Sequence, residues 1–97
     1  MQGDIGPNDP AQWIAHLQWQ ASQQGKLSLW TVYDHPTDYP ENFVARQHVV
    51  EAGSSHPTQN AFRTQRLETM RMILQAAGLV PLTRDPADDK KIIETWL

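Results

Sequence analysis

The amino-acid sequence predicts one small α+β domain with the element order α-β-β-α-β. Two segments carry apolar residues at helical spacing, and three carry the β-branched and aromatic residues that are typical of strands. A chain of 97 residues is near the lower end of what buries a core unaided, so no second domain fits. Within the single domain 1–97, we expect a loose tail over residues 1–7, a helix over residues 8–24 and the αβ core over residues 27–97.

The first predicted helix begins after Asp9, which can cap it, with Pro10 at the first helical position. Gly25 follows its end as a left-handed terminator. One stripe of this helix is apolar and consists of Trp13, Ile14, Leu17 and Ala21. Trp19 lies outside the stripe, which indicates contact on a second side. We expect this helix to cover the sheet face that the second helix leaves open, or a symmetry mate.

Two strands follow the first helix. Residues 27–33 carry bulky side chains on both faces, which indicates a central strand, and residues 43–51 have a mixed face, which indicates an edge strand. The second helix ends before Gly78 and carries an apolar stripe made of Leu67, Met70, Ile73, Leu74 and Ala77. After a loose turn over residues 52–57, three caps are suitable for its start, namely Thr58, Asn60 and Thr64. A short strand over residues 91–97 ends the chain.

The three strands predict a mixed sheet in the order 2-1-3. Strands one and two pair antiparallel, and a helix that returns over the sheet places strand three beside strand one and parallel to strand two, with a right-handed crossover. Strand three then begins at the same end of the sheet as strand two. The loop of residues 34–41 and the turn of residues 84–89 should therefore be neighbours.

These two loops contain most of the reactive side chains of the chain. The predicted polar cluster combines carboxylates, an imidazole and two guanidinium groups from Asp34, His35, Asp38, Arg46, Arg84, Asp85, Asp88 and Asp89. Asp34, His35 and Asp38 are candidate ligands of a divalent metal, and His35 is a candidate base for hydrolysis. The same residues can simply cap turns. We favour salt bridges in which Arg46 and Arg84 each bind a carboxylate, because no metal or nucleophile spacing is diagnostic.

Aromatic residues offer a second candidate surface, made of Trp13, Trp19, Trp30 and Tyr39. Four Trp in 97 residues is many for so small a core. Trp, Tyr and Arg concentrate in interface hot spots, so these side chains could bind a protein partner or a second copy of the chain. The alternative, which we favour, is that they fill the core, because a small domain needs large side chains to bury enough area.

Composition restricts the class of function. The formal net charge is -3, and residues 61–97 carry six bases against five acids, so no concentrated cationic face is available for nucleic acid. The absence of Cys excludes disulfides, a thiolate nucleophile and Cys-based zinc sites, and favours a reducing compartment. Neither a signal peptide nor an apolar run of roughly 20 residues is present. We therefore expect a cytoplasmic protein with no nucleic-acid or membrane partner and no cofactor.

Four short runs form a signature: WTVYDHP at residues 30–36, FVAR at 43–46, RDP at 84–86 and ETWL at 94–97, with Asp38 and Pro40 after the first. Together they resemble a group of short bacterial proteins of unknown function. The resemblance spans about residues 27–97 apart from residues 52–63, so the first helix lies outside it. It implies no catalytic residue, because the signature carries no established chemistry.

These observations predict a non-enzymatic protein-interaction or structural module, with a homodimer as one form of it. The alternative is a divalent-metal-binding or hydrolytic site built from the loop of residues 34–38 and the turn of residues 84–89. An enzyme is the less favoured of the two.

Overall fold

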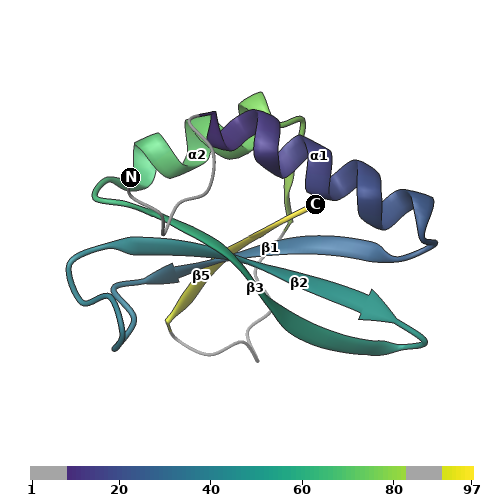
Figure 1. Cartoon of the computed structure of the whole chain (residues 1–97). Helices are drawn as coiled ribbons and strands as arrows, with labels where there is room; N and C mark the ends of the chain where they lie inside the picture. Colours follow the sequence, from purple (N-terminus) through teal and green to yellow (C-terminus); the bar gives the residue numbers. More distant parts are fainter. Residues whose placement is uncertain (1–8, 83–90) are drawn as a thin grey trace.

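The computed structural model describes residues 9–82 and 91–97, which form a sheet with two helices on one of its faces (Figure 1). The helices are α1 (Pro10–Gln23) and α2 (Leu67–Ala76). The sheet has the order β3-β2-β1-β5-β4, and every pairing is antiparallel. Its strands are β1 (Leu27–Asp34), β2 (Phe43–Glu51), β3 (Ser54–Thr64), β4 (Pro81–Leu82) and β5 (Ile92–Trp96). Among the described helices, none is long and apolar enough to cross a membrane.

The prediction of a three-stranded mixed sheet is wrong, because the sheet has five strands. The largest omission is β3, which occupies the residues assigned to a loose turn and to the start of the second helix. β3 pairs with β2 from Thr64 opposite Phe43 to Ser54 opposite Glu51, and it places Phe62 in the core. Few of its side chains are buried, so it lacks the apolar alternation that identifies a strand. β2 is therefore an interior strand, and β3 is the edge.

The turn between β2 and β3 explains why this hairpin is difficult to predict from the sequence. Ala52 and Gly53 form a two-residue connection, and both have positive φ, 53° and 81° respectively. Two positive φ values are the mark of the type I′ turn that fits the twist of a hairpin. Asn-Gly and Asp-Gly are its usual sequences, whereas Ala rarely adopts positive φ. The Ala-Gly pair is therefore a weak turn signal for a real turn.

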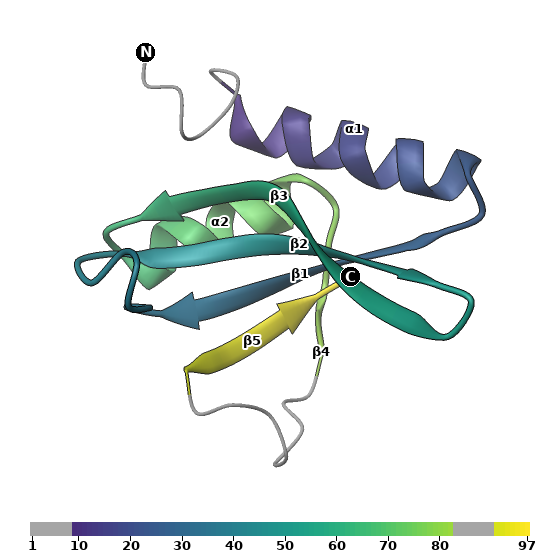
Figure 2. The same ribbon diagram turned by 60° about the horizontal axis from the view of Figure 1, so that its bottom comes forward.

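The second omitted strand, β4, lies on the far side of β5 (Figure 2). It is only two residues long, with Pro81 opposite Trp96 and Leu82 opposite Thr95. A two-residue strand carries no detectable alternation. β5 itself pairs antiparallel with β1, which therefore has neighbours on both sides, β2 and β5.

One apolar core fills the space between the sheet and both helices. Its buried members are Ile14, Trp30, Val32, Ala45, Phe62, Met70, Leu74, Leu79 and Trp96. Asp9 caps α1 by accepting a hydrogen bond of 3.1 Å from the Gln12 N–H, as the sequence predicts. The prediction that α1 covers the other sheet face or a symmetry mate is wrong. Trp13 of α1 packs edge-on against Trp30 at 5.9 Å, which holds α1 on the same face as α2.

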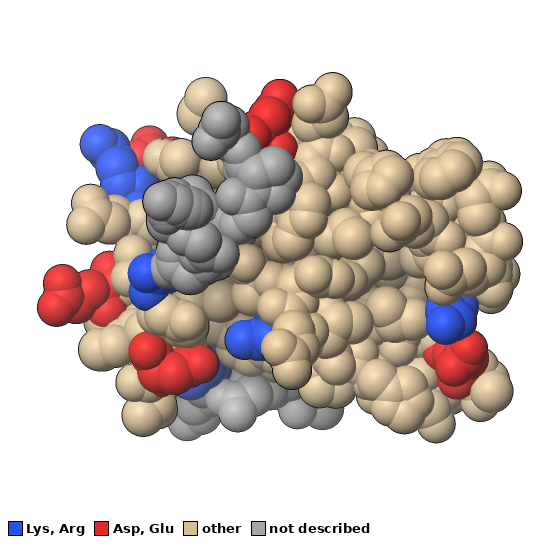
Figure 3. Space-filling model, in the orientation of Figure 1, with Lys and Arg blue, Asp and Glu red and all other residues tan. Residues whose placement is uncertain are grey.

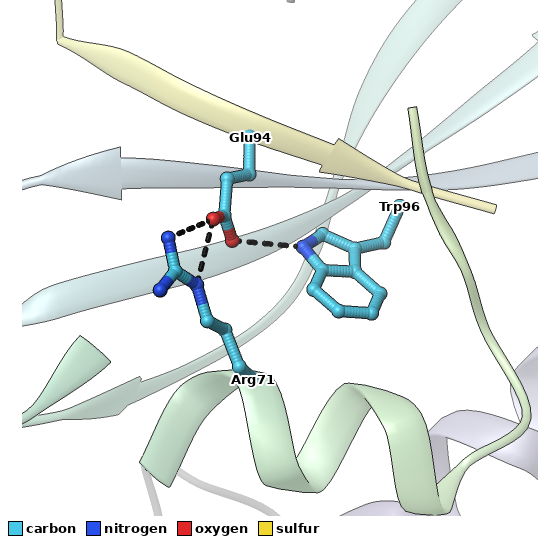
Figure 4. A network of polar contacts seen from close by, with 3 residues as sticks. All are labelled: Arg71, Glu94 and Trp96. Atoms are coloured by element: carbon cyan, nitrogen blue, oxygen red, sulfur yellow. Dashed lines mark hydrogen bonds and ion pairs between the residues drawn. The ribbon is translucent and has the colours of Figure 1, made fainter. Parts of the chain in front are cut away.

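A polar contact fastens α2 to β5 at the edge of this core (Figure 4). The Arg71 guanidinium donates from Nε and Nη2 to Glu94 Oε2, the first bond measuring 2.7 Å. The indole Nε1 of buried Trp96 donates to the other oxygen, Glu94 Oε1, at 3.0 Å. The hydrogen bonds that Arg71 donates to Glu94 raise the pKa of Arg71 above its ordinary value. The Glu94 carboxylate thus accepts hydrogen bonds both from α2 and from a tryptophan of the core.

Candidate functional site

The sheet face that α1 and α2 leave uncovered is the candidate site, here called the uncovered sheet face. Trp30 and Val32 of β1 lie in the core, so the residues between and beside them, Leu29, Thr31 and Tyr33, point to the opposite face. Their register partners on β2 are, in the same order, His48, Arg46 and Val44. The uncovered sheet face therefore combines hydroxyl, guanidinium and imidazole groups.

A hydrogen bond of 3.2 Å joins Tyr33 Oη to His48 Nε2 on this face. The pair of Thr31 with Arg46 lies between these two residues in the sheet register, so the Tyr33 and His48 side chains reach toward each other over that pair. This Tyr33–His48 bridge helps to cover Thr31, which is only 8% exposed although no described helix lies over it. The bridge fixes two polar side chains in one geometry.

Burial lowers the pKa of His48 below its ordinary value of 6.5, and the positive charge of Arg46 lowers it further. The imidazole is therefore neutral at pH 7, with one N–H donor and one lone pair that accepts. The tautomer decides whether Tyr33 or His48 donates in their shared hydrogen bond. An anion beside Arg46 would reduce the repulsion and raise the pKa of His48.

Arg46 has hydrogen-bonding capacity to spare. Its Nη1 donates to the Thr58 carbonyl oxygen at 2.7 Å, and among the described residues it forms no ion pair. On one side of it lies a hollow of about 210 Å³, lined by Tyr33, Pro36, Asp38, Val44 and Arg46. On the other side lies a hollow of about 570 Å³, lined by Arg46, Pro57, Thr58 and Gln59. A guanidinium so placed can bind a carboxylate through two parallel hydrogen bonds.

Asp34 and His35 of the predicted polar cluster form a pair of their own. Asp34 Oδ1 contacts His35 Nδ1, and the His35 ring packs edge-on against Phe43 at 4.8 Å. The side chains of Asp34 and His35 are 48% and 42% exposed, respectively. Asp34 fixes the orientation of the imidazole, as an acid–base role requires. Among the described residues, however, no three His, Cys, Asp or Glu side chains come close enough together to hold a metal ion.

The rest of the predicted cluster is divided. Asp38 lines a hollow beside Arg46, yet the two form no ion pair. The turn members lie outside the described residues: Arg84, Asp85, Asp88 and Asp89. The start of the last strand does reach the 34–41 loop, since the Asp34 N–H donates to the Lys91 carbonyl at 2.8 Å. Lys91 Nζ also donates to the His35 carbonyl oxygen at 3.2 Å.

The four aromatic candidates occupy different places. Trp30 is fully buried, and Trp13 packs against it and the core. Trp19 is 59% exposed and stacks on His16 at 6.0 Å on the outer side of α1. Tyr39 lies under the Arg63 guanidinium, 4.5 Å from its ring centre. Trp13 and Trp30 thus serve the core, whereas Trp19 and Tyr39 lie at the surface.

His48 is the residue of the uncovered sheet face that the sequence does not single out, since it reads as an ordinary mid-strand histidine. A usable signal was present. Once β1 and β2 form an antiparallel pair, the alternate positions Tyr33, Arg46 and His48 must share one face. Their common polar character, on a face that neither α1 nor α2 covers, then predicts a binding surface.

Comparison of the chain with protein-family models, curated proteins and solved structures finds no match. Its function therefore has to be inferred from its own geometry.

Proposed function

We propose that this chain is a non-enzymatic protein-interaction module that binds an acidic segment of a partner protein on the uncovered sheet face. Arg46 is the observation that carries the proposal. Its guanidinium borders two hollows, forms no ion pair among the described residues and lies beside the Tyr33–His48 bridge. Arg and Tyr are the residue types that concentrate in interface hot spots.

Charge complementarity favours an acidic partner. A carboxylate can accept two N–H bonds from Arg46, and the neutral His48 imidazole lies on the same face. Asp38 lines the same hollow and opposes an anion by like-charge repulsion. The local balance between Arg46 and Asp38 should therefore set the affinity.

The test is a titration of the full chain with a hexaglutamate peptide, followed by NMR at the Arg46 and His48 side chains. Arg46→Gln should weaken binding about tenfold, since it removes a charged two-bond contact. Asp38→Asn should strengthen binding. Docking should also raise the pKa of His48, because a carboxylate offsets the charge of Arg46.

The matched control is Arg66→Gln. Arg66 is an exposed arginine at the start of α2 that pairs with Glu68, away from the uncovered sheet face. The Arg66→Gln substitution should leave the affinity for the hexaglutamate peptide unchanged. Equal losses from Arg46→Gln and Arg66→Gln would reduce the binding to unspecific charge attraction and overturn the proposal. A homodimer in light scattering that Arg46→Gln dissociates would assign the face to a second copy and also overturn it.

A cytoplasmic location belongs to the same proposal, and the absence of Cys supports it. The metal-binding and hydrolytic hypotheses for the 34–41 loop stay predictions, because their second half, residues 84–89, lies outside the described residues.

A further inference from the structure

A groove of about 340 Å³ lies on the other side of the sheet, between α1 and the β2–β3 hairpin. Although Thr58 of β3 lines both this groove and the larger hollow beside Arg46, the floor of the groove is formed by the helix-facing residues of β2. Gln47, Val49 and Glu51 alternate along that strand and line the groove in this order. The groove therefore has an amide end, an apolar middle and a charged mouth.

The amide end is built around Gln47, which is only 4% exposed. Its Nε2 donates to Ser28 Oγ at 2.8 Å, while its Oε1 accepts from Asn60 Nδ2 at 2.9 Å and from Thr58 Oγ1 at 3.2 Å. These bonds fix the orientation of both amides. Asn60 retains one side-chain N–H and its oxygen, for which no partner exists among the described residues.

A buried amide at this position is a departure from the apolar pattern of the core. Gln47 pairs in the sheet register with Trp30, one of the largest core side chains. Burying an amide costs free energy unless it is hydrogen-bonded. A small domain also buries little apolar area, so a polar residue in place of an apolar one reduces an already small stabilisation. Departures of this kind concentrate at functional sites. The network thus points to a role beyond packing.

The mouth of the groove carries one cation and one anion. Lys26 Nζ lies 3.4 Å from Glu51 Oε1, and their side chains are 33% and 57% exposed. Figure 3 shows a neighbouring cationic and anionic patch at the lower right, surrounded by uncharged surface. Exposed pairs of this kind contribute little stability, so a ligand can separate them at small cost. Two opposite charges side by side complement a zwitterion.

We propose that this groove binds a free α-amino acid with an amide side chain, of which glutamine is the type. Its carboxylate faces Lys26 and its ammonium group faces Glu51 at the mouth. The methylene stem lies over Val49, and the side-chain amide meets the remaining donor and acceptor of Asn60. This proposal does not rest on the acidic-segment proposal, since its binding groups are Lys26, Glu51 and Asn60 and not Arg46.

The test is NMR titration of the full chain with L-glutamine, followed at the side-chain amides of Gln47 and Asn60. The Trp30 indole N–H is a third reporter, because it donates to Gln18 Oε1, which also contacts Ser28 Oγ. Three analogues each remove one element of recognition. N-acetyl-L-glutamine lacks the ammonium charge, 4-aminobutanamide lacks the carboxylate, and L-norleucine lacks the amide. Each should bind about tenfold more weakly, as expected for loss of a charged or buried hydrogen bond.

Two surface variants locate the site without disturbing the core. Lys26→Met and Glu51→Gln should each weaken glutamine binding about tenfold. Arg66→Gln, at an exposed arginine that does not line the groove, should leave it unchanged. We expect a dissociation constant of roughly 1 mM. The absence of chemical-shift changes at about 20 mM glutamine would therefore overturn the proposal. Equal affinity for N-acetyl-L-glutamine would overturn it as well, because the charged mouth would then play no part.

Discussion

At the scale of single residues, His48 makes the stability of the fold depend on pH. Burial and the charge of Arg46 lower its pKa in the folded chain, so the unfolded chain binds the proton more tightly. The contribution of His48 to the free energy of unfolding is therefore fully present above the unfolded pKa of about 6.5. It is lost as the pH falls from there through the lower pKa of the folded chain. We expect the urea midpoint to drop between about pH 7.5 and pH 5.5.

The two causes of this shift can be separated. His48→Gln removes the titrating group and should flatten the profile between these pH values. Arg46→Gln removes only the smaller cause, so the drop should shrink without disappearing. A wild-type midpoint that rises on acidification over this range would contradict the direction of the pKa shift.

Residue signals that act locally can be read from the sequence, and those that depend on distant partners cannot. The cap at Asp9 needs only the N–H of Gln12 three residues away, so its position was predictable. The positive φ of Ala52 is imposed by the pairing of β2 with β3, which overrides the preference of Ala. No local rule points to that turn.

At the scale of elements, Glu94 decides how firmly α2 is held to β5. Glu94→Ala removes the ion pair with Arg71 and leaves the buried Trp96 N–H without its acceptor, at a cost of about 1–3 kcal/mol. Glu94→Gln keeps an oxygen for Trp96 and should cost less, about 1 kcal/mol, since Arg71 is half-exposed. Urea unfolding of both variants measures the difference. Equal losses would show that the indole hydrogen bond contributes nothing.

The elements themselves were predictable in proportion to how much apolar area each one buries. α1, α2, β1, β2 and β5 all contribute core side chains, and the sequence predicts each of them. β3 contributes only Phe62 to the core, both residues of β4 are exposed, and the sequence misses both strands. The predicted sheet therefore has too few strands, although its apolar strands were identified correctly. Hydrophobic periodicity does not detect strands that bury so few apolar side chains.

At the scale of the whole molecule, one core supports both helices, so damage to it should be felt everywhere. Leu74 is fully buried on α2, and Leu74→Ala should cost about 2–5 kcal/mol. Met72 lies on the same helix and is 68% exposed, so Met72→Ala should change the free energy of unfolding by less than about 0.5 kcal/mol. Urea midpoints of the two variants test this. Similar losses would place Leu74 outside the core.

Only part of the candidate site could be predicted, because a site depends on which face each strand presents. Arg46, Asp38 and Tyr39 were identified from their residue types. Asp34 has the parity of the core-facing residues of β1, whereas Arg46 pairs with Thr31 on the other face, and this follows from the sheet register, which a single sequence does not give. The placement of α1 on the same face as α2 then leaves the other face without a helix among the described residues.

The edge strand β3 carries a consequence for solubility. An open strand edge is a template for a neighbouring chain, and natural sheets blunt such edges with proline, bulges or short strands. β3 contains Pro57 beside a register shift, and the opposite edge, β4, is two residues long. Pro57→Val restores one backbone N–H to this edge strand and should make the protein aggregate on mild heating, as measured by light scattering. On this argument, the proline of the edge strand protects the sheet from adding further strands from other copies.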